Sequence, residues 1–299
     1  MQIRGVTRSN LKLMLRLREE HKVINLETLD RSPESAGRCF VRLQEPSVPP
    51  RLQLYCLPYA GGSARVFQSW RNILPADIAL FGVEYPGRGR RISELAIDRI
   101  DILASQLVGT LAEVPRGPYA LFGHSMGALA AFEMAHQLAW CGAPLPILLI
   151  VSGHGAASVP STDRPVHASP DDEFLARLRE LNATPPEVLE MPDLLELMMP
   201  ILRADFRAAE TYVPADRPKL DIPIVAYGGL LDPDVSRDQL LAWANETTAR
   251  CTVRMFPGDH FFLRTAPDNV VATLVRDLTQ ALQASVARVT PGVSQYAPQ

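Results

Sequence analysis

The pentapeptide GHSMG, residues 123–127, places a serine between two glycines where a strand-forming run gives way to a helical one. This spacing matches the G-x-S-x-G pattern, in which a serine occupies a sharp strand-to-helix turn. A turn this tight brings the positions two residues before and after the serine close together, so only glycine fits there. The turn lifts the hydroxyl clear of the sheet, and the N-terminus of the following helix favours negative charge beside it. Ser125 is therefore the predicted nucleophile.

Such a serine needs a base, because its hydroxyl is hardly ionised at neutral pH. Among the six histidines, His260 follows the last predicted strand in FPGDHFFL, at the same sheet edge as Ser125. His124 adjoins the serine, and its side chain is expected to point away from it. The other four lie outside the alternating region, within a helix or directly after the fourth strand: His21, His167, His136 and His154. His260 is the predicted base.

An acid that follows another strand should hold the imidazole in place. The stretch YGGLLDPDVS supplies Asp232 and Asp234 directly after a predicted strand at 222–229. Asp232 is favoured because Pro233 fixes the chain there, and Asp234 and Asp163 remain alternatives. The order serine, aspartate, histidine along the chain is typical of α/β-hydrolases.

A tetrahedral intermediate at Ser125 needs two backbone N–H donors for its oxyanion. One is expected from Met126, directly after the nucleophile, and the other from the turn PYAGGSA after the first core strand. Ala60 is the predicted donor in that turn, where Gly61 and Gly62 allow the backbone to approach a ligand closely.

Short apolar runs alternate with helical patterns along most of the chain, which predicts an α/β fold with a mostly parallel central sheet covered by helices on both faces. The expected strands lie in 52–58, 79–89, 119–124, 146–153, 222–229 and 251–258. The expected helices lie at 97–111, 126–140, around 236–247 and around 268–285.

Consecutive helical patterns between 169 and 213 break this alternation and predict a helical lid inserted over the carboxyl edge of the sheet. Pro200 should bend or interrupt the second lid helix. The predicted organisation is a leader of unknown role, a core in two parts, the lid and a disordered tail: 1–45, 46–168 with 214–287, 169–213 and 288–299.

Apolar side chains of the lid could line a channel for an acyl chain, and methionine suits a pocket that accepts varied chains. The residues selected for that channel are Leu194, Met198, Met199 and Leu202. Ordinary packing of the lid onto the sheet is the alternative for each of them. The basic residues Arg88, Arg90 and Arg91 could meet an acidic partner, but a solvated turn is the favoured interpretation.

The bulk composition narrows the classes of function. Thirty basic and 33 acidic residues give a net charge of −3, which offers no electrostatic case for nucleic acid or an anionic membrane. No apolar run is long enough for a spanning helix, and the N-terminus does not resemble a signal peptide. Four scattered cysteines without metal-ligand spacing predict reduced thiols, a cytoplasmic location and no metal site.

Six blocks occur in the order and approximate spacing of type II thioesterases, which the chain resembles over residues 40–285. The blocks are LPYAGGSA, EYPGRGRR, GHSMGALAAFEMA, PILRADFRAAETY, GGLLDPDVS and FPGDHFFL. Residues 1–37 have no counterpart in that pattern. The resemblance implies an α/β-hydrolase fold, and it places the nucleophile at Ser125, the acid at Asp232 and the base at His260. It places the oxyanion donors at Ala60 and Met126.

The same resemblance implies a function in antibiotic biosynthesis. Type II thioesterases hydrolyse acyl groups from the phosphopantetheine arm of acyl or peptidyl carrier proteins and so unblock misprimed or stalled polyketide and nonribosomal peptide synthases. No cofactor is expected, since the substrate brings its own phosphopantetheine, and the protein is expected to be a monomer. The alternatives are another serine acyl hydrolase or acyltransferase on the same scaffold, a product-releasing synthase thioesterase, and a non-catalytic binding module.

Overall fold

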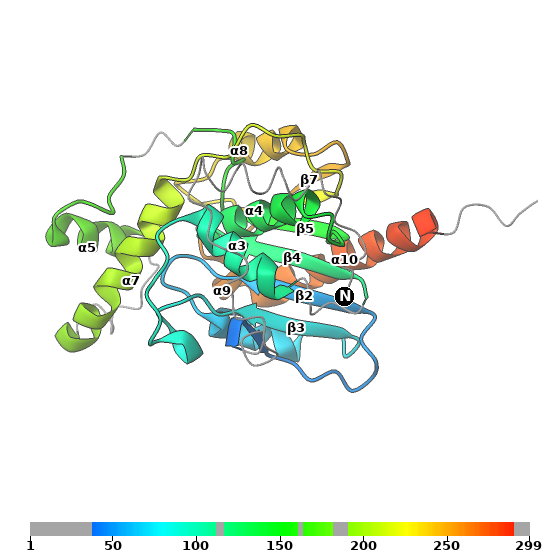
Figure 1. The fold of residues 1–299 in the computed structure, drawn as a ribbon, viewed down its shortest axis with the longest axis horizontal. Coiled ribbons are helices and arrows are strands. Elements are labelled where there is room, and N and C mark those ends of the chain that lie inside the picture. Colours follow the sequence, from blue (N-terminus) through cyan, green and yellow to red (C-terminus); the bar gives the residue numbers. More distant parts are fainter. Residues whose placement is uncertain (1–37, 112–116, 161–163, 182–190, 290–299) are drawn as a thin grey trace, which may run out of the picture.

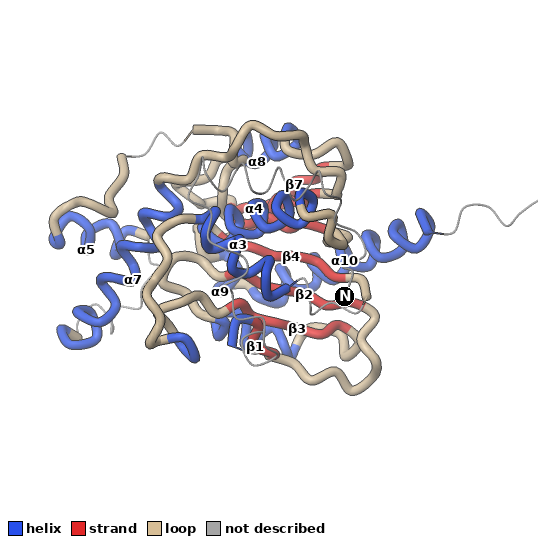
Figure 2. Tube along the Cα trace, in the orientation of Figure 1, coloured by secondary structure: helices blue, strands red, loops and turns tan. Residues whose placement is uncertain are grey.

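The computed structural model describes residues 38–111, 117–160, 164–181 and 191–289. A sheet of seven strands forms its middle layer, in the order β1-β3-β2-β4-β5-β6-β7 (Figures 1 and 2). β1 pairs antiparallel with β3, and every other neighbouring pair is parallel. The strands are β1 Phe40–Arg42, β2 Leu52–Leu57, β3 Ile78–Val83, β4 Tyr119–His124, β5 Leu148–Ser152, β6 Ile224–Gly229 and β7 Cys251–Phe256. The predicted mostly parallel sheet is confirmed.

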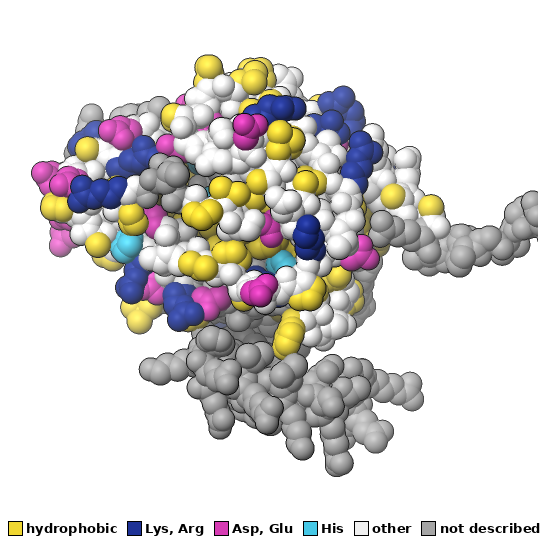
Figure 3. All heavy atoms as spheres, turned by 90° about the horizontal axis from the view of Figure 1, so that it is seen from above, with side chains coloured by type: hydrophobic (Ala, Val, Ile, Leu, Met, Phe, Trp, Pro, Cys, Tyr) yellow, Lys and Arg dark blue, Asp and Glu magenta, His cyan; other side chains and the backbone are white. Residues whose placement is uncertain are grey.

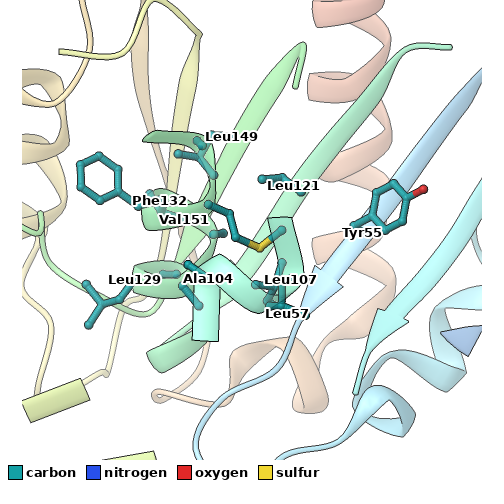
Figure 4. Close-up of a cluster of buried hydrophobic side chains, with 14 of the residues drawn as sticks. Tyr55, Leu57, Ala104, Leu107, Leu121, Leu129, Phe132, Leu149 and Val151 are labelled. Atoms are coloured by element: carbon teal, nitrogen blue, oxygen red, sulfur yellow. The ribbon is translucent and has the colours of Figure 1, made fainter. Parts of the chain in front are cut away.

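Successive side chains of the central strands enter two different cores, because neighbouring positions of a strand point to opposite faces. In β4, Leu121 joins one buried cluster and Phe122 joins the other. The first cluster is shown in Figure 4 and lies beneath α3, Ile100–Leu111, and α4, Met126–Trp140. The second lies beneath the 3-10 helix η2, Ala64–Asn72, and α10, Pro267–Val289. Both faces of the sheet are thus covered by helices.

The strand order fixes where a ligand can bind. After β2 the chain adds β3 on one side, between β2 and the earlier edge strand β1, and then adds β4, β5, β6 and β7 in turn on the other side. In open sheets of this kind, ligands bind outside the carboxyl ends of the strands where the direction of building reverses. That point lies between β2 and β4, so the loops after Leu57 and His124 should border the site. Ser125 follows β4 directly.

Two helices of the predicted lid, α5 Asp171–Glu180 and α7 Pro192–Glu210, lie together at one end of the molecule, to the left in Figure 1. They share a small core of Phe174, Leu178 and Leu202. α7 runs through Pro200 without interruption, so an interruption at this residue is wrong, and a bend there stays a prediction. A proline inside a helix costs about 3 kcal/mol, and we attribute its tolerance here to the apolar contacts that α7 makes.

Four short helical elements lie in the loops that follow the strands. α8, Arg237–Leu241, begins with a capping box in which Ser236 and Gln239 bond each other's backbone, and it is followed by the 3-10 helix η4, Ala242–Asn245. α9, Phe262–Thr265, follows the loop after β7. A further 3-10 turn, η3, covers Gly89–Arg91.

The predicted leader is wrong in its last residues. Phe40–Arg42 is a strand at the edge of the sheet, and Cys39 and Phe40 are buried in the first core, where the Phe40 ring lies 5.2 Å from that of Tyr55. A three-residue strand is too short for its alternation to be recognised in a sequence. Residues 1–37 of the leader lie outside the described residues. Of the predicted tail, 288–299, the first two residues belong to α10, and the part from 290 onward lies outside the described residues.

The surface agrees with the nearly balanced charge of the chain. Basic and acidic side chains are interspersed on the face shown in Figure 3. Within the described ranges, the helices are all too short or too polar to cross a bilayer.

Candidate active site

Ser125 occupies a strained turn between β4 and α4. Its φ of 55° and ψ of −120° make it the one residue other than glycine with a positive φ in the described part of the chain. Such a conformation is costly for an L-residue and persists only where the surroundings enforce it. Here the Ser125 N–H donates to the Ser152 carbonyl at 2.7 Å, and its own carbonyl accepts from the Ala128 N–H at 2.8 Å. β5 and α4 therefore hold the serine in place.

The two glycines of the pentapeptide are required by close backbone contacts. A Cβ on Gly123 would lie 2.0 Å from the carbonyl oxygen of Gly127. A Cβ on Gly127 would lie 2.3 Å from the carbonyl oxygen of Leu57, in the neighbouring strand β2. Both positions therefore exclude every side chain, as the spacing predicts.

His260 and Asp232 arrive from the loops after β7 and β6 and meet at hydrogen-bond distance. His260 Nδ1 lies 2.8 Å from Asp232 Oδ2, and the aspartate side chain is fully buried. Because an ionised carboxylate only accepts hydrogen bonds, Nδ1 carries the proton and Nε2 is left with a free lone pair. His260 lines the same cavity as Ser125, as a general base should.

The alternative acid, Asp234, has a different partner. Its Oδ1 accepts from Arg177 Nη2, on the lid helix α5, at 2.8 Å. Asp232, Asp234 and His260 lie within 4.8 Å of one another, each measured at one donor atom, so proximity alone does not distinguish the two acids. The hydrogen bond between His260 Nδ1 and Asp232 Oδ2 distinguishes them, and it favours Asp232 as the acid. Asp163, the third choice, lies outside the described residues.

His124 is fully buried behind the nucleophile. Its Nδ1 lies 2.9 Å from Ser152 Oγ, and its ring lies 5.1 Å from that of His260. Burial, together with the nearby His260, holds the pKa of His124 well below its ordinary value, so the ring is neutral. It therefore adds no charge beside the predicted base.

A cavity of about 740 Å³ opens above these groups. Ser125, Met126, Ala60 and His260 all line it, so the structure brings the predicted nucleophile, base and both oxyanion donors to one space. Its volume is within the range of pockets that enclose a small-molecule ligand. The roles of these residues remain predictions.

The lid lines the cavity with residues other than those selected from the sequence. Leu181, Phe206 and Tyr212 border it. In the described part of the lining, none of the four selected channel residues is found: Leu194, Met198, Met199 and Leu202. Met198 and Met199 pack against the small core that α5 and α7 share, and not against the sheet as the packing alternative expects. Contact of the four with an acyl chain stays a prediction.

The basic turn after β3 is not solvated as expected. Arg88 and Arg91 are buried, at 7% and 3% exposure, and only Arg90 faces solvent. Arg91 binds Glu94 at 2.6 Å, and Arg88 binds Asp205 of the lid helix α7. Asp205 was not selected from the sequence, although a single aspartate on the buried face of an amphipathic helix was a usable signal.

A pH-dependent stability follows from a buried histidine beside the cavity. Burial lowers the pKa of His136 to about 4, and its ring packs edge-on against Phe132 at 4.5 Å. Below pH 6.5 the unfolded chain binds a proton at this residue before the folded protein does, so stability is lost as the pH falls from 6.5 toward 4. From pH 6.5 to 5, His136 should lower the free energy of unfolding by about 2 kcal/mol.

Urea unfolding at pH 7 and pH 5 measures this loss. Replacing the ring by an uncharged group, His136→Gln, should make the decline with pH shallower. The pKa values of His124 and His154 are also lowered by burial, so part of the decline should persist in the variant. An identical decline in both proteins would contradict the assignment to His136.

The fold and the site together define a class of enzyme. A mostly parallel sheet with a strained serine after one strand, and an aspartate and a histidine after two later strands, is the arrangement of an α/β-hydrolase. The family model named Thioesterase domain matches residues 52–278, most of the chain. The chain therefore belongs to the thioesterase family, and its reaction is hydrolysis of a thioester.

Individual relatives agree with this membership. The gramicidin S biosynthesis protein GrsT of Aneurinibacillus migulanus is 34% identical over 232 residues, which are 78% of this chain and 91% of that protein. The structure of BorB, a type II thioesterase from the borrelidin biosynthetic cluster, is 37% identical with a TM-score of 0.73 and covers 82% of this chain and 97% of its own. YbtT, a type II thioesterase from the yersiniabactin pathway, is 32% identical with a TM-score of 0.75, covering 82% and 99%. The predicted resemblance to type II thioesterases is confirmed.

Proposed function

We propose that the protein releases acyl groups from the phosphopantetheine arm of carrier domains and so clears misprimed or stalled polyketide or nonribosomal peptide synthases. The observation that carries this proposal is Ser125, held in a strained turn at the wall of a cavity that His260 also lines. Similarity to type II thioesterases of synthase pathways supports the choice of a carrier-bound substrate.

The first half of the reaction transfers the acyl group to the enzyme. Ser125 Oγ attacks the thioester carbonyl while His260 Nε2 takes its proton, and Asp232 stabilises the imidazolium that forms. The backbone N–H groups of Ala60 and Met126 bind the oxyanion. The carbon–sulfur bond then breaks, and the thiolate of the arm leaves with the proton from His260.

The second half restores the enzyme. Water enters, His260 removes its proton, and the hydroxide attacks the acyl-Ser125 ester. The carbon–oxygen bond to Ser125 breaks and the serine regains its proton, so a free carboxylic acid is released. This sequence uses no cofactor of the protein's own. A cytoplasmic location, a monomeric state and indifference to nucleic acid remain predictions.

Substrate preference tests the proposal. We expect faster hydrolysis of an acyl group linked through sulfur to a carrier protein than of the same acyl group linked through oxygen. Intact-mass measurement of the carrier domain before and after incubation reports loss of the acyl group directly. A preference for the oxygen ester would favour a general esterase on the same scaffold, and transfer of the acyl group to an amine or alcohol would favour an acyltransferase.

A further inference from the structure

The loop that carries the predicted oxyanion donor Ala60 is a tight turn. Residues 59–62 form the turn, which is closed by the Gly62 N–H donating to the Tyr59 carbonyl at 2.8 Å. Gly61 has a φ of +75°, which is typical of the third residue of a type II turn. A type I turn differs from it mainly by rotation of the middle peptide, here the one between Ala60 and Gly61. A group that accepts a hydrogen bond from the N–H of this peptide therefore decides whether the turn is of type II or type I.

That group belongs to the lid. The Gly61 N–H, which is part of the middle peptide, donates to Asp205 Oδ2 at 2.7 Å. Leu202 lies three residues earlier on the same face of α7. A Cβ on Gly61 would come within 2.5 Å of Leu202 Cδ2, so the leucine packs directly against the turn. α7 thus touches this one glycine with a hydrogen bond and an apolar contact.

The buried carboxylate of Asp205 forms an ion pair with the buried guanidinium of Arg88. Arg88 binds it through two hydrogen bonds, Nη1 to Oδ2 at 2.5 Å and Nη2 to Oδ1 at 2.8 Å. The side chains are 8% and 2% exposed. Arg88 also donates to the carbonyls of Gly62 and Pro86, so all five of its N–H groups have acceptors.

Stability alone does not explain such an arrangement. Replacing a buried ion pair by apolar residues of similar volume is often neutral or stabilising. In this pair, by contrast, the carboxylate and the guanidinium both also bind the backbone of the turn, at Gly61 and Gly62. The pair therefore places a hydrogen-bond acceptor at a defined point beside the turn, which an apolar pair would not do.

We propose that Asp205 is a positioning residue for the oxyanion hole: by accepting the Gly61 N–H it fixes the turn that presents the Ala60 N–H to the reacting carbonyl. This inference rests on the proposed function, because it assumes that Ala60 binds the oxyanion. Since Asp205 lies on α7, the oxyanion hole is complete only when this lid helix is seated on the core. The lid then couples enclosure of the substrate to the ability to react.

Two double variants isolate the hydrogen bond to Gly61. Arg88→Met with Asp205→Leu removes the ion pair and the acceptor together, without leaving a buried charge unpaired. Arg88→Met with Asp205→Asn also removes the ion pair but keeps an amide oxygen that can accept from Gly61. A third, control protein carries Arg254→Met with Asp277→Leu, which removes an ion pair between β7 and α10, away from the turn.

The measurements separate positioning from folding. kcat and KM are determined for an acyl-carrier thioester and for p-nitrophenyl hexanoate, and Tm reports folding. The inhibition constant of an alkylboronic acid is also measured, because its adduct with Ser125 places an anionic oxygen in the oxyanion hole. Loss of one oxyanion donor costs about 100- to 1,000-fold in kcat. We expect a fall of about 100-fold for the leucine variant, with little change in KM and a matching weakening of boronate binding.

The asparagine variant should stay within about tenfold of wild type, because the Gly61 N–H keeps its acceptor. The control should lose stability without loss of kcat. Equal activity of the leucine and asparagine variants, or a leucine variant that loses only Tm, would overturn the proposal. Wild type that hydrolyses the nitrophenyl ester but not the carrier thioester would refute the proposed function instead, and the comparison of variants on the ester would still decide the role of Asp205.

Discussion

Replacing the nucleophile, Ser125→Ala, should lower kcat for carrier unloading by about a million-fold, to the level of the uncatalysed reaction plus what binding and the oxyanion hole provide. The acyl-enzyme needs an oxygen at this position, and no other side chain in the mechanism can supply it. The measurement is the single-turnover rate of acyl loss from a carrier protein, followed by intact mass. Wild type should also show a transient mass increase on the enzyme, and the variant should show none.

A second serine provides the matched control. Ser105 lies on α3, where its hydroxyl bonds Gln137 at 2.9 Å, away from the cavity lining. Ser105→Ala should unload carriers at a rate close to wild type, and a fluorophosphonate should label it as it labels wild type. Ser125→Ala should escape labelling while keeping the Tm of the folded protein. Unloading at equal rates by Ser125→Ala and wild type would remove Ser125 from the mechanism.

The parts of the fold that the sequence predicts well are those where local and tertiary preferences agree. β4 and α4 begin and end as expected, at 119–124 and 126–140. The strand is a short, mostly apolar run between turn residues, and the helix is rich in apolar residues because most of its side chains are buried. The pentapeptide between them combines a backbone requirement with a chemical one, so the same five residues predict both the turn and the nucleophile.

The parts that sequence reasoning missed depend on contacts between distant segments. Arg88 and Asp205 are 117 positions apart, and the residues around either one do not indicate that the other is its partner. Only the folded chain shows that α7 places the aspartate against both the arginine and the turn after β2. The part of the cavity lining that comes from the lid could not be predicted for the same reason, since the rotation of α7 about its axis decides whether Met198 faces the cavity or the small lid core.

The choice between the two candidate acids, Asp232 and Asp234, also rests on a contact between distant residues. Replacing the correct acid should have the second-largest effect on kcat. Asp232→Asn should lower kcat by about 10,000-fold, as expected when the acid of such a triad is replaced by its amide. An asparagine amide can donate to Nδ1, which favours the tautomer that carries its proton on Nε2. That nitrogen then cannot accept the proton of Ser125. The loss should fall on kcat, because the buried carboxylate lies behind the His260 ring.

Asp234→Asn is the matched control, since it makes the same chemical change two residues away. It weakens the ion pair between the loop after β6 and Arg177 of the lid helix α5, where both side chains are partly exposed. Exposed ion pairs contribute about 1 kcal/mol or less, so kcat should stay within about tenfold of wild type. Steady-state kinetics of both variants on one acyl-carrier thioester, with Tm as the check on folding, decides between the acids. A larger loss of kcat in Asp234→Asn than in Asp232→Asn would assign the role to Asp234, and the hydrogen bond between Asp232 and His260 would then be structural.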